Sequence, residues 1–263
     1  MFVACSTLSF DEVPLAVAAQ RITELGLEAL EVGCIDQWAH CSPWDLAEDS
    51  AGAVRQMKQI QDETATRIVA LNCGYQLRRP EQQQSLVEGI CAFARQLGAR
   101  VVNIPAPAAG TELAEAARSF QRLVKAAAQM GRTLCVETHS GCLTEDPEAT
   151  AALLEQVPEL GLTLDPSHYL AKGLAEADWR PLYPRVRQVH LRDAGGAARQ
   201  LQTRMGQGDM PFEAIVSELK EAGYDGALVI EYLRPERLGL AEDYPVAPEI
   251  SAARDRLTAL LRY

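Results

Sequence analysis

Short apolar runs rich in β-branched residues alternate along this chain with longer segments of mixed polarity. We expect each run to form a buried strand of a parallel sheet. The eight runs cover residues 2–5, 27–32, 67–72, 100–104, 133–136, 160–164, 186–189 and 227–230. Strands that alternate with helices predict right-handed crossovers, and eight such units are typical of a closed (β/α)8 TIM barrel.

The segments between these runs predict the helices. We expect them near residues 14–25, 44–63, 81–97, 111–130, 147–156, 174–179 (weak), 211–222 and 247–261. An open doubly wound sheet is the alternative, but no GxGxxG loop follows the first strand. Because no linker-like or low-complexity tract interrupts the pattern, we predict a single α/β barrel domain over residues 1–263, with a C-terminal helix.

Four of the predicted strands end in a residue that can bind a metal. These residues are Glu137, Asp165, His190 and Glu231. The carboxyl ends of parallel barrel strands face the same way, so we expect the four side chains to converge on one mouth. Three carboxylates and one imidazole suit Mn²⁺, Mg²⁺ or Co²⁺ better than a structural zinc ion. Each acid alone is explained equally well as a solubilising residue or a cap, but recurrence at the same point of successive repeats favours a site.

The motifs around these four positions follow one another in a characteristic order. They are Glu137-Thr138-His139, Asp165-Pro166-Ser167-His168, His190-Leu191-Arg192-Asp193, Gly206-Gln207-Gly208-Asp209 and finally Glu231. The series resembles the xylose isomerase-like barrel superfamily, in the sugar-phosphate isomerase/epimerase branch that includes the ketose 3-epimerases. The resemblance implies that the four residues bind one divalent cation. We expect Mn²⁺, with Mg²⁺, Co²⁺ or Zn²⁺ as alternatives.

The resemblance also implies that Glu137 and Glu231 act as acid and base on opposite faces of the substrate. A cation chelated by a carbonyl and an adjacent hydroxyl polarises the C–H bond between them and stabilises an enediolate. One carboxylate can accept the proton and the other can return it. We therefore predict a metal-dependent isomerase or epimerase of a small sugar or polyol. A lyase of the inosose or dehydroshikimate dehydratase type and a non-catalytic sugar-binding barrel stay open.

Further site residues follow from the same resemblance. His168 and Arg204 are expected to contact substrate oxygens, although a histidine bonded to a backbone carbonyl and a solvated loop arginine are the alternatives. His139 shares the side of Glu137 and is expected to bind substrate or support a ligand. Asp193 is expected to brace the loop after the seventh strand. The roles of four further residues stay open: Glu31, which could hold a ligand or the barrel rim, and Trp38, His40 and Tyr75.

Composition narrows the class of partner and the compartment. The net charge of −11 and the pI near 4.9 argue against nucleic acid, which needs a basic surface. Only four histidines are present, too few for the three-metal site of endonuclease IV, so that activity is disfavoured. Seven cysteines without a CxxC pair, no signal segment and no run of 18 apolar residues predict a cytoplasmic protein with no membrane partner. A homo-oligomer stays open.

Overall fold

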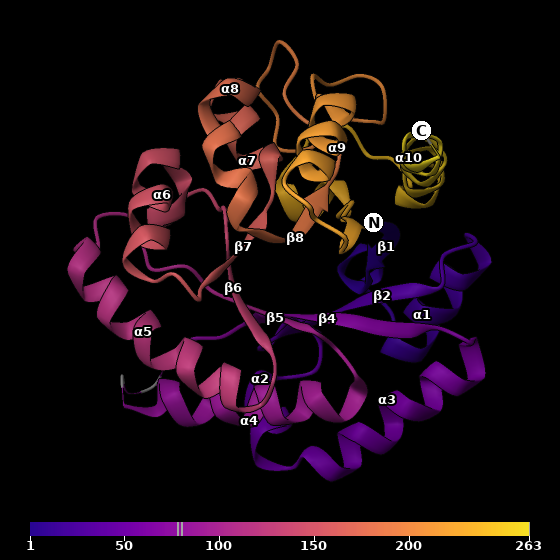
Figure 1. Ribbon diagram of the computed structural model, residues 1–263. Helices are drawn as coiled ribbons and strands as arrows, with labels where there is room; N and C mark the ends of the chain where they lie inside the picture. The colour runs from indigo at the N-terminus through magenta and orange to yellow at the C-terminus, as the bar shows by residue number, and fades with distance from the viewer. Residues whose placement is uncertain (78, 80, 263) are drawn as a thin grey trace.

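The computed structural model describes residues 1–77, 79 and 81–262, and the predicted eight parallel strands close into a barrel (Figure 1). Hydrogen bonding runs in the order β1-β9-β8-β7-β6-β5-β4-β2, and β2 pairs again with β1. The barrel strands are β1 (Phe2–Ser6), β2 (Ala29–Ile35), β4 (Arg67–Gly74), β5 (Val101–Ile104), β6 (Thr133–Glu137), β7 (Gly161–Leu164), β8 (Val186–Leu191) and β9 (Ala227–Ile230). A short strand, β3 (Ala39–His40), pairs antiparallel with the end of β2. The predicted TIM barrel is confirmed.

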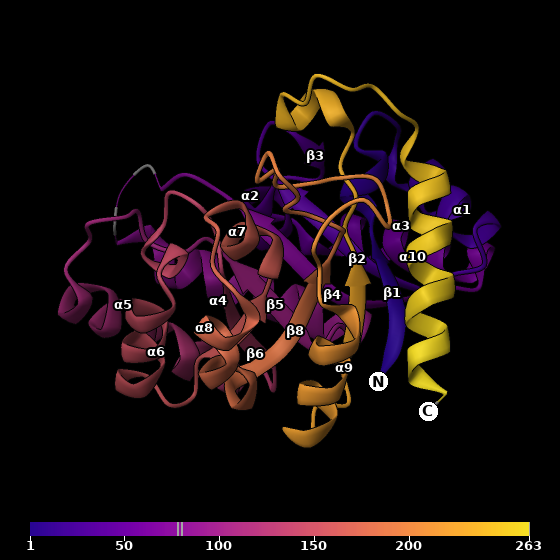
Figure 2. The same cartoon turned by 90° about the horizontal axis from the view of Figure 1, so that it is seen from above.

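Helices surround the barrel on its outside (Figures 1 and 2). They are α1 (Leu15–Glu24), α2 (Pro43–Glu48), α3 (Ser50–Thr64), α4 (Gln82–Leu97), α5 (Leu113–Gln129), α6 (Pro147–Gln156), α7 (Pro166–Ala171), α8 (Glu176–Trp179), α9 (Phe212–Glu221) and α10 (Val246–Leu261). The C-terminal helix α10 packs against β1 and α9, so it completes the outer layer where the two ends of the chain meet. No helix within the described residues is both long and apolar enough to span a membrane.

The structure differs from the predicted helices at two places. The segment predicted as one helix over residues 44–63 forms α2 and α3, which are separated at Asp49, where φ is −129° and ψ is 70°. The close packing of α2 on α4 constrains α2 here, since a Cβ atom at Gly89 would lie 2.6 Å from the Cβ atom of Ala47. Helix α7 was not predicted. It begins directly after Asp165, whose side chain accepts a hydrogen bond from the backbone N–H of Ser167, and has Pro166 in its first turn.

The barrel interior changes character along its axis. Small apolar side chains fill the end where the strands begin, in a cluster of Ala4, Ala29, Ala227 and Val229 with Phe2 and Val69 packed against it. Buried polar and charged residues occupy the end where the strands finish, among them Glu31, Asn103, His190 and Glu231. Burying such groups is costly unless they are paired or bind a ligand, so this end is the candidate functional site.

Candidate metal centre

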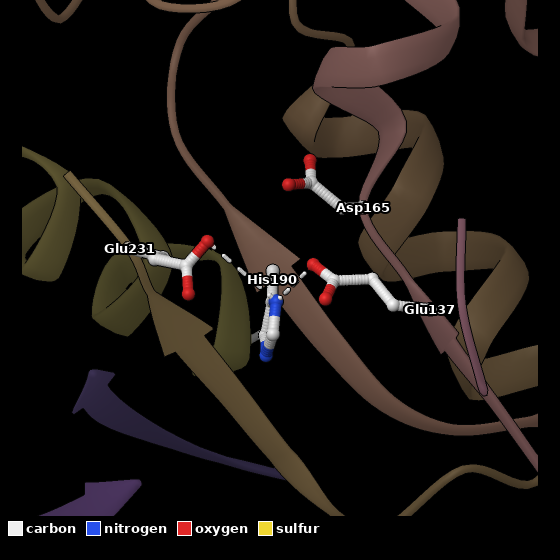
Figure 3. Close-up of side chains that lie close together, drawn as sticks. All are labelled: Glu137, Asp165, His190 and Glu231. Carbon is white, nitrogen blue, oxygen red and sulfur yellow. Dashed lines mark hydrogen bonds and ion pairs between the residues drawn. The ribbon is translucent and has the colours of Figure 1, made fainter. Parts of the chain in front are cut away.

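The four predicted ligand residues meet at the carboxyl-terminal mouth of the barrel (Figure 3). Glu137 is the last residue of β6, Asp165 follows β7, His190 lies near the end of β8, and Glu231 follows β9. One potential ligand atom from each residue lies within 4.8 Å of those of the other three. In Figure 3 the carboxylates of Glu137 and Glu231 flank the imidazole of His190. The strand-end pattern of the sequence therefore corresponds to a cluster in space.

The size and charge of this cluster fit one hard divalent cation. Oxygen ligands lie about 2.0–2.6 Å from such ions, so ligands on opposite sides are about 4.0–5.2 Å apart. Asp165 and His190 are fully buried and Glu231 nearly so. Burial raises the pKa of Glu231 to about 7, although His190 and Arg192 oppose this. A carboxylate that is held out of water beside two others is a group that a cation would stabilise.

The imidazole of His190 presents its two nitrogens to different partners. Its Nδ1 atom lies 2.7 Å from Oε1 of Glu137 and 3.7 Å from Oε2 of Glu231. Its Nε2 atom lies 3.0 Å from Oε2 of Glu31, which is fully buried and also accepts a hydrogen bond from the amide of Gln188. Nδ1 is thus the nitrogen on the side of the other ligands, and Glu31 contacts the opposite side of the ring. A carboxylate behind a metal-binding histidine orients the ring and raises its basicity.

A buried arginine contacts the cluster from another side. The guanidinium Nη2 of Arg192 donates to Oδ2 of Asp165 at 2.6 Å, and Nη1 lies 3.4 Å from Oε2 of Glu231. Its Nε donates to the hydroxyl of Ser167. Arg192 follows His190 by two residues, a spacing that places side chains on the same face of an extended segment. Arg192 lies within the His190-Leu191-Arg192-Asp193 motif, and its two-residue spacing from His190 is the sequence signal that places it at the site.

Two asparagines connect the glutamates that were predicted as acid and base. The side-chain amide of Asn103, in β5, donates to Oε2 of Glu137 at 3.1 Å and to Oδ1 of Asn72 at 3.0 Å. Asn72, in β4, donates in turn to Oε1 of Glu231 at 3.5 Å. Neither asparagine was predicted as a site residue, although both lie near the ends of barrel strands, as the ligand residues do. The bonds fix the orientation of the two carboxylates relative to one another.

His168 and His139 lie together beside this cluster. Their ring centroids are 4.3 Å apart. His168 is buried in α7, where its Nδ1 accepts a hydrogen bond from the backbone N–H of Ser140 and its Nε2 lies 3.6 Å from Oδ2 of Asp165. Burial lowers the pKa of His168 to about 4, so the ring is neutral near neutral pH. The alternative role for His168 was donation to a backbone carbonyl, whereas in the structure its Nδ1 accepts from a backbone N–H.

A cavity of about 260 Å³ opens beside the candidate ligands Glu137 and Glu231, which are part of its lining. Its polar lining comprises Asn72, Asn103, Glu137, His139, His168, Arg192 and Glu231. Trp38, Leu201, Leu233 and Leu238 are among the apolar residues of its wall. Small-molecule sites in proteins are typically cavities of about 300–1,000 Å³ with a few convergent polar groups, so this cavity is slightly smaller than that range.

Other predicted site residues lie elsewhere. Among the described residues, Arg204 is not part of the cavity lining, and its Nε instead donates to Oε1 of Glu249 at 3.1 Å. Its contact with substrate stays a prediction. The Nε2 atom of His40 lies 2.9 Å from the carbonyl oxygen of Thr7, close enough to donate a hydrogen bond to it. Tyr75 packs against the main core.

The expected bracing role of Asp193 is confirmed. Its carboxylate accepts hydrogen bonds from the backbone N–H groups of Gly206, Gly208 and Met210, at 2.7, 3.2 and 3.3 Å. A side chain at Gly208 would collide with Asp193 and the carbonyl of Ala194, so the close approach requires glycine. Asp193, which directly follows Arg192, therefore holds the loop after β8 in place.

Comparison with known proteins assigns this barrel to a family. A family model described as xylose isomerase-like TIM barrel matches residues 19–260. The chain belongs to the xylose isomerase-like TIM barrel family. The resemblance noted from the motifs is confirmed by this match. A comparison with curated protein sequences finds no match.

Solved structures of similar shape cover nearly the whole chain. D-psicose 3-epimerase with D-tagatose, from Clostridium cellulolyticum H10, has a TM-score of 0.76 at 14% identity and 99% coverage of each chain. The probable 3-DHS dehydratase AsbF of Bacillus anthracis, involved in petrobactin synthesis, has a TM-score of 0.73 at 17% identity, covering 98% of this chain and 99% of that one. The IOLI protein with a binding zinc atom has a TM-score of 0.73 at 19% identity, covering 99% and 98%. At these identities the likeness shows a shared fold.

Proposed function

We propose that this protein is a divalent-metal-dependent isomerase or epimerase of a small sugar or polyol. The observation that carries the proposal is the placement of Glu137 and Glu231 on two sides of His190, at the floor of one cavity (Figure 3). Two carboxylates that face a substrate from different sides can remove a proton from one face of a carbon and return it to the other. That transfer is the chemistry of epimerisation.

The cation would be held by Glu137, Asp165, His190 and Glu231, with Mn²⁺ as the expected ion. When bound, it would supply positive charge that polarises a substrate carbonyl and stabilises the negative charge that develops on substrate oxygens. The oxygen-rich donor set of these four residues and the separation of at most 4.8 Å between their ligand atoms support this proposed cation site.

The chain's own residues have separate roles in this proposal. Glu137 and Glu231 move the proton, while Asn103 and Asn72 hold one oxygen of each carboxylate in place. His168 and His139 bind hydroxyl groups of the substrate from the side of α7. Apolar residues such as Trp38 and Leu233 exclude water from the cavity, which strengthens these electrostatic contacts.

The nature of the substrate is supported by the cavity and by the neighbours in shape. A small cavity with amide, imidazole and guanidinium donors suits a short polyhydroxylated molecule. The similar structures include a 3-epimerase of the ketose D-psicose with D-tagatose bound. Ketoses are therefore the first substrates to test.

The test is incubation of the Mn²⁺-loaded protein with a panel of ketoses in D₂O. We expect one ketose to be converted to an epimer or isomer that carries solvent deuterium at the reacting carbon, detected by NMR and mass spectrometry. Glu137→Gln should lower this conversion, because an amide cannot serve as acid or base. Glu155→Gln, an exposed change on α6, is its matched control and should keep full activity. A product that has lost water would instead indicate a lyase. Deuterium-free substrates and no product across ketoses and related polyols would contradict the proposal.

A further inference from the structure

A second and larger hollow, of about 920 Å³, lies at the opposite end of the barrel, where the strands begin. Among the described residues, its lining includes four arginines, Arg67, Arg100, Arg132 and Arg187, but only one acidic residue, Asp225. The chain as a whole carries a net charge of −11. The acidic composition of the whole chain does not account for the excess of positive charge in this hollow.

None of these four arginines forms an ion pair with a carboxylate within the part of the chain that the structure describes. The guanidinium of Arg132 donates through Nη1 to the carbonyl of Ala99, but its Nε is buried and has no hydrogen-bond partner among residues 1–77, 79 and 81–262. Arg187 donates through Nη1 to the carbonyls of Pro184 and Val186. Arginine has five N–H donors, so most donors of this group remain available to a ligand.

The backbone is arranged to bring Arg187 into the hollow. Leu162 pairs with Val186 and Thr163 with Gln188, so Arg187 is the extra residue of a β-bulge in β8. A bulge turns a side chain away from the direction that strict alternation would give it. Gly161 provides the room, because a Cβ atom there would lie 2.8 Å from Cγ of Arg187. The arginine is therefore positioned by two features of neighbouring strands.

Arg67 is held over the floor of the same hollow. Its guanidinium carbon lies 3.9 Å from the centre of the Phe2 ring, which packs against the small apolar cluster inside the barrel. Stacking on an aromatic face fixes the plane of a guanidinium while its N–H groups stay free at the edge. A fixed planar fork is the geometry that arginine uses to bind phosphate oxygens in pairs.

We infer that this hollow binds a small polyanion that carries at least two phosphate groups. Phosphate accepts the paired hydrogen bonds that arginine offers, and arginines from separate strands can engage adjacent phosphates. Arg187 precedes His190 by three residues of β8, which is roughly 10 Å of strand. The hollow is thus a binding site separate from the metal centre, and its occupancy does not depend on the proposed isomerase activity.

The probe is inorganic tripolyphosphate, titrated calorimetrically into the full-length protein at physiological ionic strength. We expect saturable binding that weakens at high salt, because these arginines are solvent-accessible. In the double variant Arg100→Gln/Arg187→Gln, affinity should fall by about tenfold per arginine lost, as expected for charge-assisted hydrogen bonds. The control Arg118→Gln/Arg122→Gln makes the same charge change on the exposed face of α5 and should bind as the parent protein does.

The variants also separate loss of binding from loss of folding. Arg100 is exposed and makes no side-chain hydrogen bond among the described residues, so Arg100→Gln alone should keep the parent melting temperature and still weaken binding of tripolyphosphate. Any chelation of metal by tripolyphosphate affects the control double variant equally. A difference in affinity between the two double variants therefore measures binding in the hollow. Absence of binding up to about 1 mM tripolyphosphate, equal binding by both double variants, or equal affinity for citrate would overturn the assignment.

Discussion

The Nε2 atom of His190 lies 3.0 Å from Oε2 of Glu31, on the side of the imidazole away from Glu137 and Glu231. Both side chains are fully buried. This contact leaves Nδ1 directed at the other ligand residues and gives the opposite nitrogen a carboxylate partner. Glu31 therefore acts on the proposed metal through the ring of His190.

Replacing Glu31 by Gln should weaken metal binding while the barrel stays folded. Loss of the partner behind a metal-binding histidine typically costs about 10–100-fold in metal affinity or activity. The measurement is a Mn²⁺ titration in competition with a chelator. Glu28→Gln, an exposed change just before β2, is the matched control. Unchanged Mn²⁺ affinity in Glu31→Gln would show that this contact has no positioning role.

Removal of the cation should lower the thermal stability of the protein. Glu137, Asp165 and Glu231 place three carboxyl groups within 4.8 Å of one another, and a cation that binds only the folded state stabilises it by mass action. Melting should therefore shift down after EDTA treatment and be restored by Mn²⁺. An identical melting temperature with and without EDTA, together with metal-free purified protein, would count against the site.

His168→Ala should reduce turnover or raise KM with metal content nearly unchanged. The side chain lines the cavity, and its Nε2 lies 3.6 Å from Oδ2 of Asp165, so we expect it to contact substrate without binding the ion itself. Elemental analysis alongside steady-state kinetics separates the two effects. Loss of the metal from this variant would reassign His168 to the ligand shell.

Asp11 ties the loop after β9 to Trp38 and should contribute stability in a pH-dependent way. Its buried carboxylate accepts hydrogen bonds from Trp38 Nε1, Arg234 Nε and Arg237 Nε, at 2.6, 2.8 and 2.6 Å. Although burial opposes them, the bonds from Arg234 and Trp38 hold the pKa of Asp11 below its ordinary value of 3.8. The contribution is therefore complete above pH 3.8 and is lost as pH falls through the lowered pKa.

Asp11→Asn should accordingly lower the free energy of unfolding by about 1 kcal/mol at neutral pH. The difference from the parent protein should narrow as the carboxyl group becomes protonated in acid. Urea unfolding over this pH range is the measurement, with Asp62→Asn on the exposed face of α3 as the control. A difference that stays constant across the range would mean that the charge of Asp11 is not what stabilises the loop.

Local sequence patterns predicted most of the fold because they depend on short segments. Apolar runs identified all eight barrel strands, and residues 147–156 form α6 as expected. The break at Asp49 could not be read in this way, because it accompanies the packing of α2 on Gly89 of α4, a contact between segments. Asp165-Pro166-Ser167-His168 is both a site motif and a helix-start signal, since Asp165 caps helix α7 and Pro166 lies in its first turn, so the motif alone does not predict the helix.

The candidate site was predictable to the extent that it lies at strand ends. Glu137, Asp165, His190 and Glu231 each follow or end an apolar run, so topology alone brings them together. The sequence left the role of Glu31 open between holding a ligand and holding the barrel rim, because its contact with His190 joins residues 159 positions apart across the barrel. Asn72 to Glu231 is another contact at that separation. Such pairs depend on barrel closure and side-chain direction, which a single sequence does not encode locally.

The two-carboxylate mechanism depends most directly on Glu231. Replacing it by Gln keeps an oxygen that can bind a hard cation but removes the basicity needed for proton transfer. The decisive measurement is turnover and deuterium incorporation by Glu231→Gln in D₂O, at verified Mn²⁺ occupancy, on a ketose that the parent protein converts. We predict turnover lower by about 10²–10⁴-fold, with any remaining solvent exchange confined to the face served by Glu137. Full turnover by the metal-loaded variant would contradict the account and move the second acid/base to another residue, with His139 the first to examine.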